Sequence, residues 1–153
     1  ENTWDLGSLS RTAWVDYGIH DNPRASGLAS GTNFVYIQEK GDDNDGSPMT
    51  SYIESADFDL GDGEQFMFVS RLIPDIDITS SDAEASVNYV LKTRNYPGDS
   101  LVTNSTSAIQ ATTEQAFLRS RSRQASLRIE SSTTDITWTL GDLRLDLRPD
   151  GRR

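Results

Sequence analysis

Two pairs of aspartates have the spacing that catalysis by paired acids would require. Asp57 with Asp59, and Asp75 with Asp77, are each separated by one residue. On a β-strand this spacing places both carboxylates on the same face, an arrangement that glycoside hydrolysis could use. Acidic β proteins carry many such pairs without catalysis, so we interpret these four residues as solvent-facing or arginine-paired acids.

Two further segments could in principle hold a proton or a cation. His20, the only histidine of the sequence, lies in a polar, turn-like segment and has no second histidine with which to build a triad or a metal site. The run from Asp42 to Asp45, followed by Gly46, resembles a calcium loop because it supplies oxygen ligands around a glycine. Gly41 falls where the first ligand of an EF-hand would stand, so we interpret the run as a hydrated acidic turn.

The composition excludes several classes of site. The sequence has no cysteine, which excludes disulfides, thiolate zinc sites, iron–sulfur clusters and cysteine nucleophiles. It has no glycine-rich phosphate loop, no Gly-x-Ser-x-Gly elbow and no His-Glu-x-x-His pair. We therefore expect a protein that is not an enzyme and that needs no metal or other cofactor. A glycosidase that uses one of the aspartate pairs stays open as an alternative.

Arginine has the most uneven distribution of the charged residues. The net charge is −10, but residues 1–118 carry six basic against nineteen acidic groups (net −13), whereas residues 119–153 carry eight arginines against five acids (net +3). Only two of the basic residues are lysines. Because the planar guanidinium group suits bidentate pairing with carboxylates, this bias predicts interfaces or fixed ion pairs. A cationic segment can also bind nucleic acid, but the excess of acidic residues in the rest of the chain argues against that interpretation.

The arginines recur with the two-residue period of a β-strand. Arg119, Arg121 and Arg123 would lie on one face of a strand, and the small and apolar residues between them on the other. Residues 143–148 alternate leucine with charge, so one face should pack and the other should form ion pairs. The residues that we expect in ion pairs or in an interface are Arg119, Arg121, Arg123, Arg128, Arg144, Arg148 and Asp146.

The segments that would position these arginines are short and predict an all-β fold. Runs of β-branched and aromatic residues alternate with Gly, Asp, Asn, Ser and Pro clusters at intervals of roughly ten residues, and no strong helix pattern is present. We expect an antiparallel β-sandwich or barrel-like domain. The expected strands include residues 33–38, 85–94, 136–140 and 143–148.

Two predictions concern how the strands are joined. Gly61-Asp62-Gly63 accepts positive φ, so it should form a tight hairpin between residues 50–59 and 66–73. Residues 115–130 predict one long alternating strand.

Residues 100–113, which are rich in Thr and Ser, suit a solvent-facing strand or loop.

Three tryptophans are candidate aromatic anchors in a core or a subunit interface. They are Trp4, Trp14 and Trp138. Together with the five tyrosines they could instead form a platform on which a sugar stacks. A carbohydrate-binding or receptor-binding β-sandwich module is therefore the alternative function.

The length fits a single domain over residues 1–153. A possible subdivision places residues 1–48 at the edge of a preceding domain and residues 49–153 in the sandwich. The chain begins without Met and in mid-pattern, which suggests a piece of a longer protein. It has no apolar run of about 18 residues, so we expect no membrane span.

Several motifs together resemble one family of viral structural proteins. The resemblance covers most of the chain and is densest in the last 35 residues. The motifs are Arg11-Thr12-Ala13-Trp14-Val15-Asp16, Tyr36 with Glu39 and Gly41, Glu54-Ser55, Phe58-Asp59-Leu60-Gly61-Asp62-Gly63, Ile73-Pro74-Asp75, Tyr96-Pro97-Gly98, residues 119–131, and Trp138 with Gly141-Asp142 through to Asp150-Gly151-Arg152-Arg153. The sequence is similar in these to the C-terminal region of tail or head-to-tail connector proteins of tailed, chiefly short-tailed, bacteriophages.

The resemblance implies a non-enzymatic structural role in a virion. The partners would be other copies of the same chain in a ring and neighbouring virion proteins, with transient proximity to DNA and assembly in the host cytoplasm. A larger, propeller-like β portion would precede this region in the family. The family more often has Arg-Gly-Arg where this chain has Arg121-Ser122-Arg123, so a glycine-dependent bend is not expected there.

Overall fold

The structure, a computed structural model, describes residues 13–17, 21–29, 32–44 and 46–152. All regular elements in these ranges are β-strands, and all pair antiparallel. The chain divides into two compact units, residues 1–41 and 42–153. The sequence predicted the boundary after residue 48, seven residues later than the boundary in the structure.

The first unit contains a three-stranded sheet in the order β1-β2-β3. Its strands are β1 (Ala13–Val15), β2 (Arg24–Ala29) and β3 (Thr32–Ile37). The sheet leaves large apolar side chains exposed to solvent on both faces. Those side chains are Trp14, Val15, Phe34, Val35 and Ile37. A sheet of this size with apolar groups on both faces is typical of a surface that another chain or domain covers.

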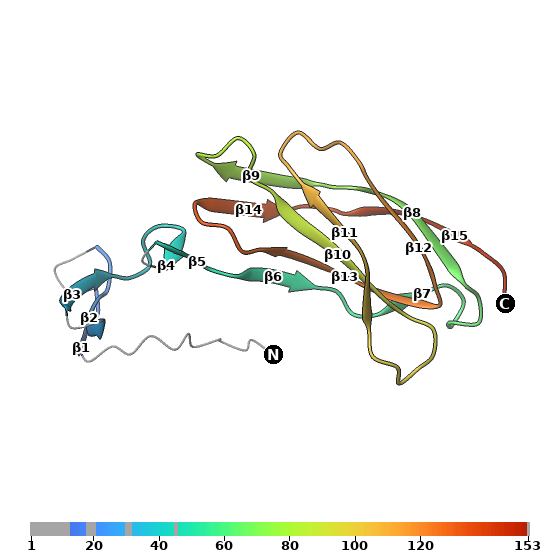
Figure 1. Cartoon of the computed structure of the whole chain (residues 1–153), viewed down its shortest axis with the longest axis horizontal. Helices are drawn as coiled ribbons and strands as arrows, with labels where there is room; N and C mark the ends of the chain where they lie inside the picture. Colours follow the sequence, from blue (N-terminus) through green and yellow to red (C-terminus); the bar gives the residue numbers. More distant parts are fainter. Residues whose placement is uncertain (1–12, 18–20, 30–31, 45, 153) are drawn as a thin grey trace. The chain divides into compact units, whose positions relative to one another are not determined.

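The first sheet of the second unit has the order β11-β10-β13-β6 (Figure 1). The strands are β11 (Val102–Ile109), β10 (Val87–Arg94), β13 (Gln124–Ser131) and β6 (Ser51–Glu54). The short strand β7 (Phe58–Asp59) also pairs with β13, beyond a bulge. At this bulge the Ser55 hydroxyl accepts a hydrogen bond from the Leu127 amide (3.0 Å), which keeps that amide satisfied where the ladder is interrupted.

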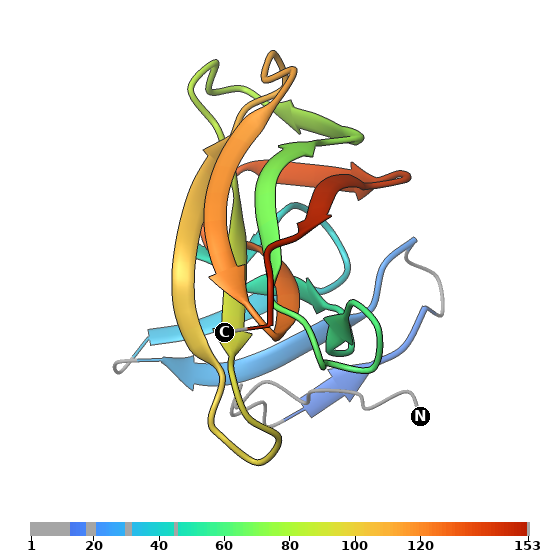
Figure 2. The same cartoon turned by 90° about the vertical axis from the view of Figure 1, so that its right-hand side faces the viewer.

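The second sheet has the order β12-β8-β15, and a two-stranded pair β14-β9 continues it (Figure 2). The strands are β12 (Ala116–Ser122), β8 (Met67–Ile73), β15 (Arg144–Pro149), β14 (Ile136–Leu140) and β9 (Ile76–Ser80). β8 and β9 run on in one line, as do β14 and β15, and the register of the two pairs is almost the same. The expected strands 136–140 and 143–148 are therefore two parts of one long ribbon, with a kink at Gly141-Asp142.

The kink is held by Asp75 and Gly141. The Gly141 amide donates to the Asp75 carbonyl (2.8 Å), and the Asp142 amide donates to the Asp75 carboxylate (3.0 Å). Pro74 has no amide to donate, so the ladder must be interrupted here. The carboxylate of Asp75 takes over part of the pairing that the proline prevents.

The two sheets face each other and enclose one hydrophobic core, which confirms the predicted β-sandwich. β12 alternates strictly between buried and exposed residues, as its neighbour β8 does in part, and the inward residues of β10 and β13 meet both strands from the other sheet. The largest fully buried side chains include Tyr89, Met67, Leu72, Leu91 and Ile129. β11 lies beside β12 without pairing to it, which partly closes one side of the sandwich.

The predicted Gly61-Asp62-Gly63 hairpin is wrong. All three residues have positive φ, as expected for a turn. However, β7 before the turn pairs with β13 in the first sheet, and β8 after it pairs with β12 and β15 in the second. The turn is a crossover between layers, because the preceding strand has already taken β13 as its partner.

The prediction of one strand over residues 115–130 is also wrong. The run consists of β12 in the second sheet and β13 in the first, and Arg123 stands at the corner between them. The alternation itself is confirmed on β12, where Leu118, Ser120 and Ser122 are buried and Arg119 and Arg121 are exposed. The phase of the alternation changes at this corner, because odd-numbered residues of β12 point outward whereas Leu127 and Ile129 of β13 are buried.

One buried hydroxyl has a testable effect on stability. Tyr89 is 0% exposed and its hydroxyl has no hydrogen-bond partner among the described residues. Burying an unpaired polar group is unfavourable. We expect Tyr89→Phe to raise the free energy of unfolding by about 1 kcal/mol, measured by denaturant titration at neutral pH. A decrease of similar size would show that the hydroxyl has a stabilising partner.

The same hydroxyl should affect stability at high pH. Burial raises the pKa of Tyr89 to about 12, and the Asp75 carboxylate adds to the rise. In the unfolded chain a tyrosine ionises near about pH 10. The stability that depends on a protonated Tyr89 hydroxyl is therefore fully present below about pH 10. It is lost as the pH rises from about 10 to about 12, because only the unfolded chain can release this proton easily. Over this interval the wild type should lose more stability than Tyr89→Phe.

Candidate functional site

The outer face of the second sheet gathers most of the predicted arginines. On β12, Arg119 and Arg121 point outward, and on β15 Arg144 and Arg148 do so. β8 lies between these strands, and the register places Arg121 and Arg148 on either side of Phe68. We call this surface the guanidinium face. It consists of Arg71, Arg119, Arg121, Arg123, Arg144 and Arg148 with Phe66, Phe68, Phe117, Asp146 and Asp150.

Aromatic rings support the guanidinium groups of this face. The guanidinium carbon of Arg121 lies 3.9 Å from the ring centre of Phe66, and that of Arg123 lies 4.7 Å from the same ring. Arg148 lies 4.7 Å from the ring centre of Phe68. Stacking on a ring fixes the plane of a guanidinium group while its N–H edges stay available to a ligand.

Two carboxylates of the face are already paired. Asp146 accepts from Arg71 (2.6 Å), and Asp150 accepts from Arg121 (2.6 Å). Arg119, Arg144 and Arg148 make no ion pair with any residue in the described ranges, and all three are exposed. Six arginines against two aspartates leave the face with a net charge of +4. Unpaired, ordered guanidinium groups of this kind suit an external anion.

Arg123 has a different position from the other two arginines of its run. At the corner between the sheets it donates to the carbonyls of Gly63, Glu64 and Arg152, at 3.0, 3.0 and 3.1 Å. The Phe66 amide donates to Gly151 (2.8 Å), so the C-terminal segment extends the pairing of β8 and β15. Arg123 therefore fastens the corner to this segment.

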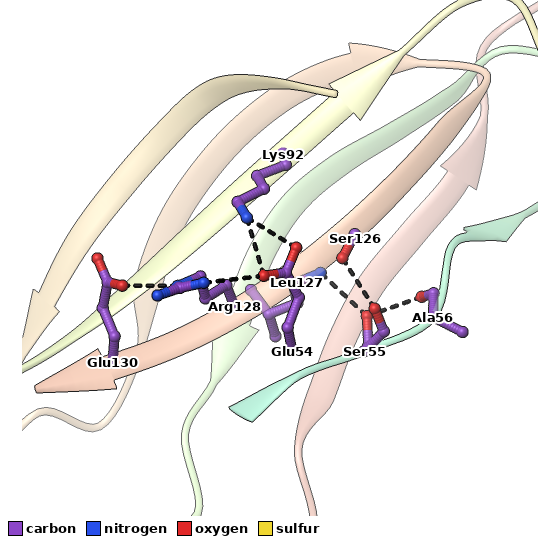
Figure 3. Close-up of polar contacts among 8 residues, drawn as sticks. All are labelled: Glu54, Ser55, Ala56, Lys92, Ser126, Leu127, Arg128 and Glu130. Carbon is purple, nitrogen blue, oxygen red and sulfur yellow. Dashed lines mark hydrogen bonds and ion pairs between the residues drawn. The ribbon is translucent and has the colours of Figure 1, made fainter. Parts of the chain in front are cut away.

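Arg128 does not belong to the guanidinium face. It lies on the outer side of the first sheet, where it bonds Glu130 (2.6 Å) and Glu54 (3.2 Å) (Figure 3). Its guanidinium carbon also lies 3.8 Å from the ring centre of Tyr52. Lys92 donates to both oxygens of Glu54 at 2.7 and 2.8 Å. The network joins β6, β10 and β13, so its role is to hold the first sheet together.

This network predicts a loss of stability in acid. The Lys92 ammonium lowers the pKa of Glu54, and Arg128 lowers it further, against burial, which raises it. The contribution of Glu54 is thus present above the unfolded pKa of about 4.3 and is lost as the pH falls through the lower folded value. Glu54→Gln should be less stable than wild type by up to about 1 kcal/mol at pH 7. The difference should shrink as the pH falls below about 4.

The exposed Glu64 provides the control for this experiment. Its side chain makes no ion pair in the described part of the chain. Glu64→Gln should therefore leave the stability within about 0.5 kcal/mol of the wild type at either pH. Chemical unfolding at pH 7 and at lower pH measures both variants. An equal and pH-independent loss in Glu54→Gln would contradict the ion-pair assignment.

Three of the four aspartates in the two predicted pairs bond to other residues of the sandwich. Asp57 pairs with Arg94, and Asp59 accepts from Gln124 (3.2 Å). Asp75 is bonded at the kink of the ribbon, while Asp77 points outward from β9. The carboxylates of Asp57, Asp59 and Asp75 therefore each take part in an ion pair or hydrogen bond that links elements of the sandwich.

The acidic run at residues 42–45 forms part of a small hairpin. β4 (Asp43–Asn44) pairs with β5 (Ser47–Pro48), and the Asp43 carboxylate accepts from the Gly46 amide (3.2 Å). Asp45 lies outside the described residues. In the part of the chain that the structure describes, no group of three or more His, Cys, Asp or Glu side chains is placed to hold a metal ion.

The predicted aromatic anchors fall in different settings. Trp138 is partly buried against the core, and its indole N–H donates to Ser51 (3.1 Å), which ties β14 to β6. Trp14 is 55% exposed on the small sheet of the first unit. Trp4 and His20 lie outside the described residues. Within the described ranges, no helix is long and apolar enough to cross a membrane.

A shallow pocket of about 280 Å³ opens at one end of the sandwich. The lining residues are Asp62, Gly63, Asn95, Tyr96, Pro97, Arg123 and Gln124. They come from the crossover between the sheets, the β10–β11 turn and the β12–β13 corner. Tyr96 is 66% exposed there. An exposed ring beside amide and carboxylate groups is the kind of lining that a polar ligand with one apolar face could use.

Comparison with known proteins gives no family. No protein-family model matches the sequence, and no curated protein is detectably similar to it. The functional interpretation of this chain therefore rests on its own residues.

Sequence reasoning missed the residues that organise the guanidinium face. Phe68 and Arg71 on β8, and Phe66 just before this strand, lie beside the predicted arginines, and Asp150 pairs with Arg121. The two phenylalanines have the two-residue spacing of one strand face, which was a usable signal. Their position against β12 and β15 depends on strand order, which the sequence does not contain.

Proposed function

We propose that this chain is a non-enzymatic assembly module of a larger structural protein and that it associates with neighbouring subunits through the guanidinium face. The observation that carries the proposal is the set of three exposed arginines, Arg119, Arg144 and Arg148, that have no acidic partner among the described residues. Exposed cations without an acidic partner on a sheet face fit an interface with an acidic partner surface.

Two other features support an assembly role. The small sheet of the first unit leaves apolar side chains exposed on both faces, as expected of a surface that a neighbour covers. Asp57, Asp59 and Asp75 of the two aspartate pairs are bonded to other residues of the sandwich. Together with the sequence resemblance, these features favour a virion component such as a tail tube, nozzle or head-to-tail connector.

The mass of the 153-residue chain in solution tests the proposal. We expect an oligomer by light scattering at about 50 mM salt that dissociates near about 1 M, because screening weakens contacts between exposed charges. Arg144→Ala combined with Arg148→Ala should reduce the oligomer to a monomer. A chain that remains monomeric in both salts, or an oligomer that the double variant leaves intact, would overturn the proposal.

Lys40 supplies a matched control for a single charge. It is exposed and lies in the first unit, so Lys40→Ala removes one positive charge that does not belong to the guanidinium face. We expect Lys40→Ala to keep the mass of the wild type, whereas Arg144→Ala alone should already weaken association. Equal effects of the two substitutions would show that net charge, and not the face, controls association.

The pocket at Tyr96 supports a second candidate function, the binding of a saccharide. The tyrosine ring could stack on the apolar face of a pyranose, and Asn95 and Asp62 could bond its hydroxyls. A glycan array probed with the wild type and with Tyr96→Ala tests this function. Binding that is saturable and lost in Tyr96→Ala would support it, and silence of the wild type on the array would exclude it for the glycans displayed.

A further inference from the structure

The loops at the end of the sandwich opposite the Tyr96 pocket carry only negative charge. They are residues 81–86 between β9 and β10, residues 110–115 between β11 and β12, and residues 132–135 between β13 and β14. We call these loops, together with the outward-facing Asp77 of β9, the acidic end. Its acidic residues are Asp77, Asp82, Glu84, Glu114 and Asp135, and these loops contain no lysine or arginine.

The acidic residues of this end are exposed and held by local bonds. Asp135 accepts from the hydroxyl and the amide of Ser81, which joins two of the loops. Glu84 accepts from the Gln110 side chain (2.8 Å), which joins the third loop to them. Asp77 and Glu114 are also exposed, and no cation pairs with any of these five carboxylates in the described ranges. The end therefore presents an ordered, uncompensated negative surface.

We infer that the acidic end of one copy of this chain docks on the guanidinium face of a second copy. This inference rests on the proposed assembly function and names the partner of the face. The unpaired guanidinium groups of Arg119, Arg144 and Arg148 meet the carboxylates of Asp77, Glu84 and Glu114. The exposed ring of Phe117 adds an apolar contact beside Arg119.

Charge complementarity favours a second copy over a nucleic acid. Within the face, Asp146 and Asp150 stand among the arginines, where they would oppose a continuous run of phosphates. Separate carboxylates on loops can fit between these aspartates.

The two surfaces are different parts of the chain, so the contact is head-to-tail. A head-to-tail contact leaves one unused face and one unused end on every dimer. Addition of further copies then gives a closed ring or an open filament, according to the rotation between neighbours. An isologous contact, in which two guanidinium faces met, would bring like charges together and would stop at a dimer.

A complementation experiment with the full chain tests the inference. The face variant carries Arg119→Ala, Arg144→Ala and Arg148→Ala. The end variant carries Asp77→Asn, Glu84→Gln and Glu114→Gln, which keep side-chain size and hydrogen bonding. Each variant alone should be a monomer by light scattering at about 50 mM salt, where contacts between charges are weakly screened. An equimolar mixture should give a dimer and nothing larger, because one intact face meets one intact end.

Each other outcome would overturn the inference. If the end variant alone still assembles, the partner of the face is not the acidic end, although the proposed assembly function survives. If both variants are monomers and their mixture is also monomeric, the two surfaces do not meet. If duplex DNA binds the wild type but not the face variant while the mixture stays monomeric, the face is a phosphate-binding surface. A wild type that never assembles would overturn the proposed function itself.

Discussion

Leu118→Ala should lower the free energy of unfolding by about 3 kcal/mol, which is the largest effect we expect from a single truncation on β12. Leu118 is 3% exposed and belongs to the core cluster between the two sheets. Its truncation removes buried apolar area and leaves a cavity that two hydrogen-bonded sheets can close only in part. Denaturant unfolding followed by tryptophan fluorescence measures the change.

The preceding residue is the matched control. Phe117 is larger than Leu118, but it is 58% exposed on the guanidinium face. We expect Phe117→Ala to change stability by no more than about 0.5 kcal/mol. If Phe117→Ala were the more costly of the two substitutions, β12 would present the opposite face to the core, and the assignment of the arginines to the outer face would be wrong.

Gly141→Ala should lower the free energy of unfolding by about 2 kcal/mol through overpacking. A Cβ atom at residue 141 would lie 2.5 Å from the Asp75 carboxylate oxygen and 2.6 Å from its Cγ. The Asp75 side chain is short, and the Asp142 amide bonds it, so it can move only by breaking that hydrogen bond. The backbone of Gly141 does not need positive φ, so the effect reports the close approach alone.

Removal of the opposing carboxylate tests this explanation. Asp75→Ala alone loses the bond to Asp142 and should cost about 1 kcal/mol. The combination with Gly141→Ala should then cost little more than Asp75→Ala alone, because the clash has gone. Strict additivity of the two substitutions in a double-mutant cycle would show that the glycine is required for another reason.

The strands and their faces could be predicted from the sequence, but their partners could not. The alternation around Arg119 and Arg121 predicted which side chains of β12 point outward, and the structure confirms it. The exposed, Thr- and Ser-rich character of residues 100–113 is likewise seen in β11. Alternation is a local property of an extended chain, so local sequence contains it.

Strand pairing depends on distant residues, and there the predictions failed. Gly61-Asp62-Gly63 has the positive φ values of a hairpin turn, yet it connects two layers. Turn residues fix the local path of the chain, but the partner of each flanking strand is chosen by residues more than 40 positions away. The corner at Arg123 has no glycine, proline, asparagine or aspartate, and only a change in the phase of the alternation marks it.

The sequence predicted the arginines of the candidate site but not the phenylalanine rings on which they stack. Arg144 and Arg148 were expected to form ion pairs, whereas they have no acidic partner among the described residues and one of them stacks on Phe68. Arg128 was grouped with them but belongs to the opposite sheet, since the chain changes layer at Arg123. Only the three-dimensional order of β12, β8 and β15 separates the two sets.

The central place of β8 has a consequence for the time course of synthesis. β8 needs β12 on one side and β15 on the other, and β15 begins at Arg144. A ribosome that has released residues 67–73 must therefore add more than 70 further residues before the second sheet can close. Until then one hydrogen-bonding edge of β8 lacks its partner strand, which favours slow folding and exposes nascent chains to aggregation. Neighbouring chains that assemble during translation would be at greatest risk of exchanging their last strand.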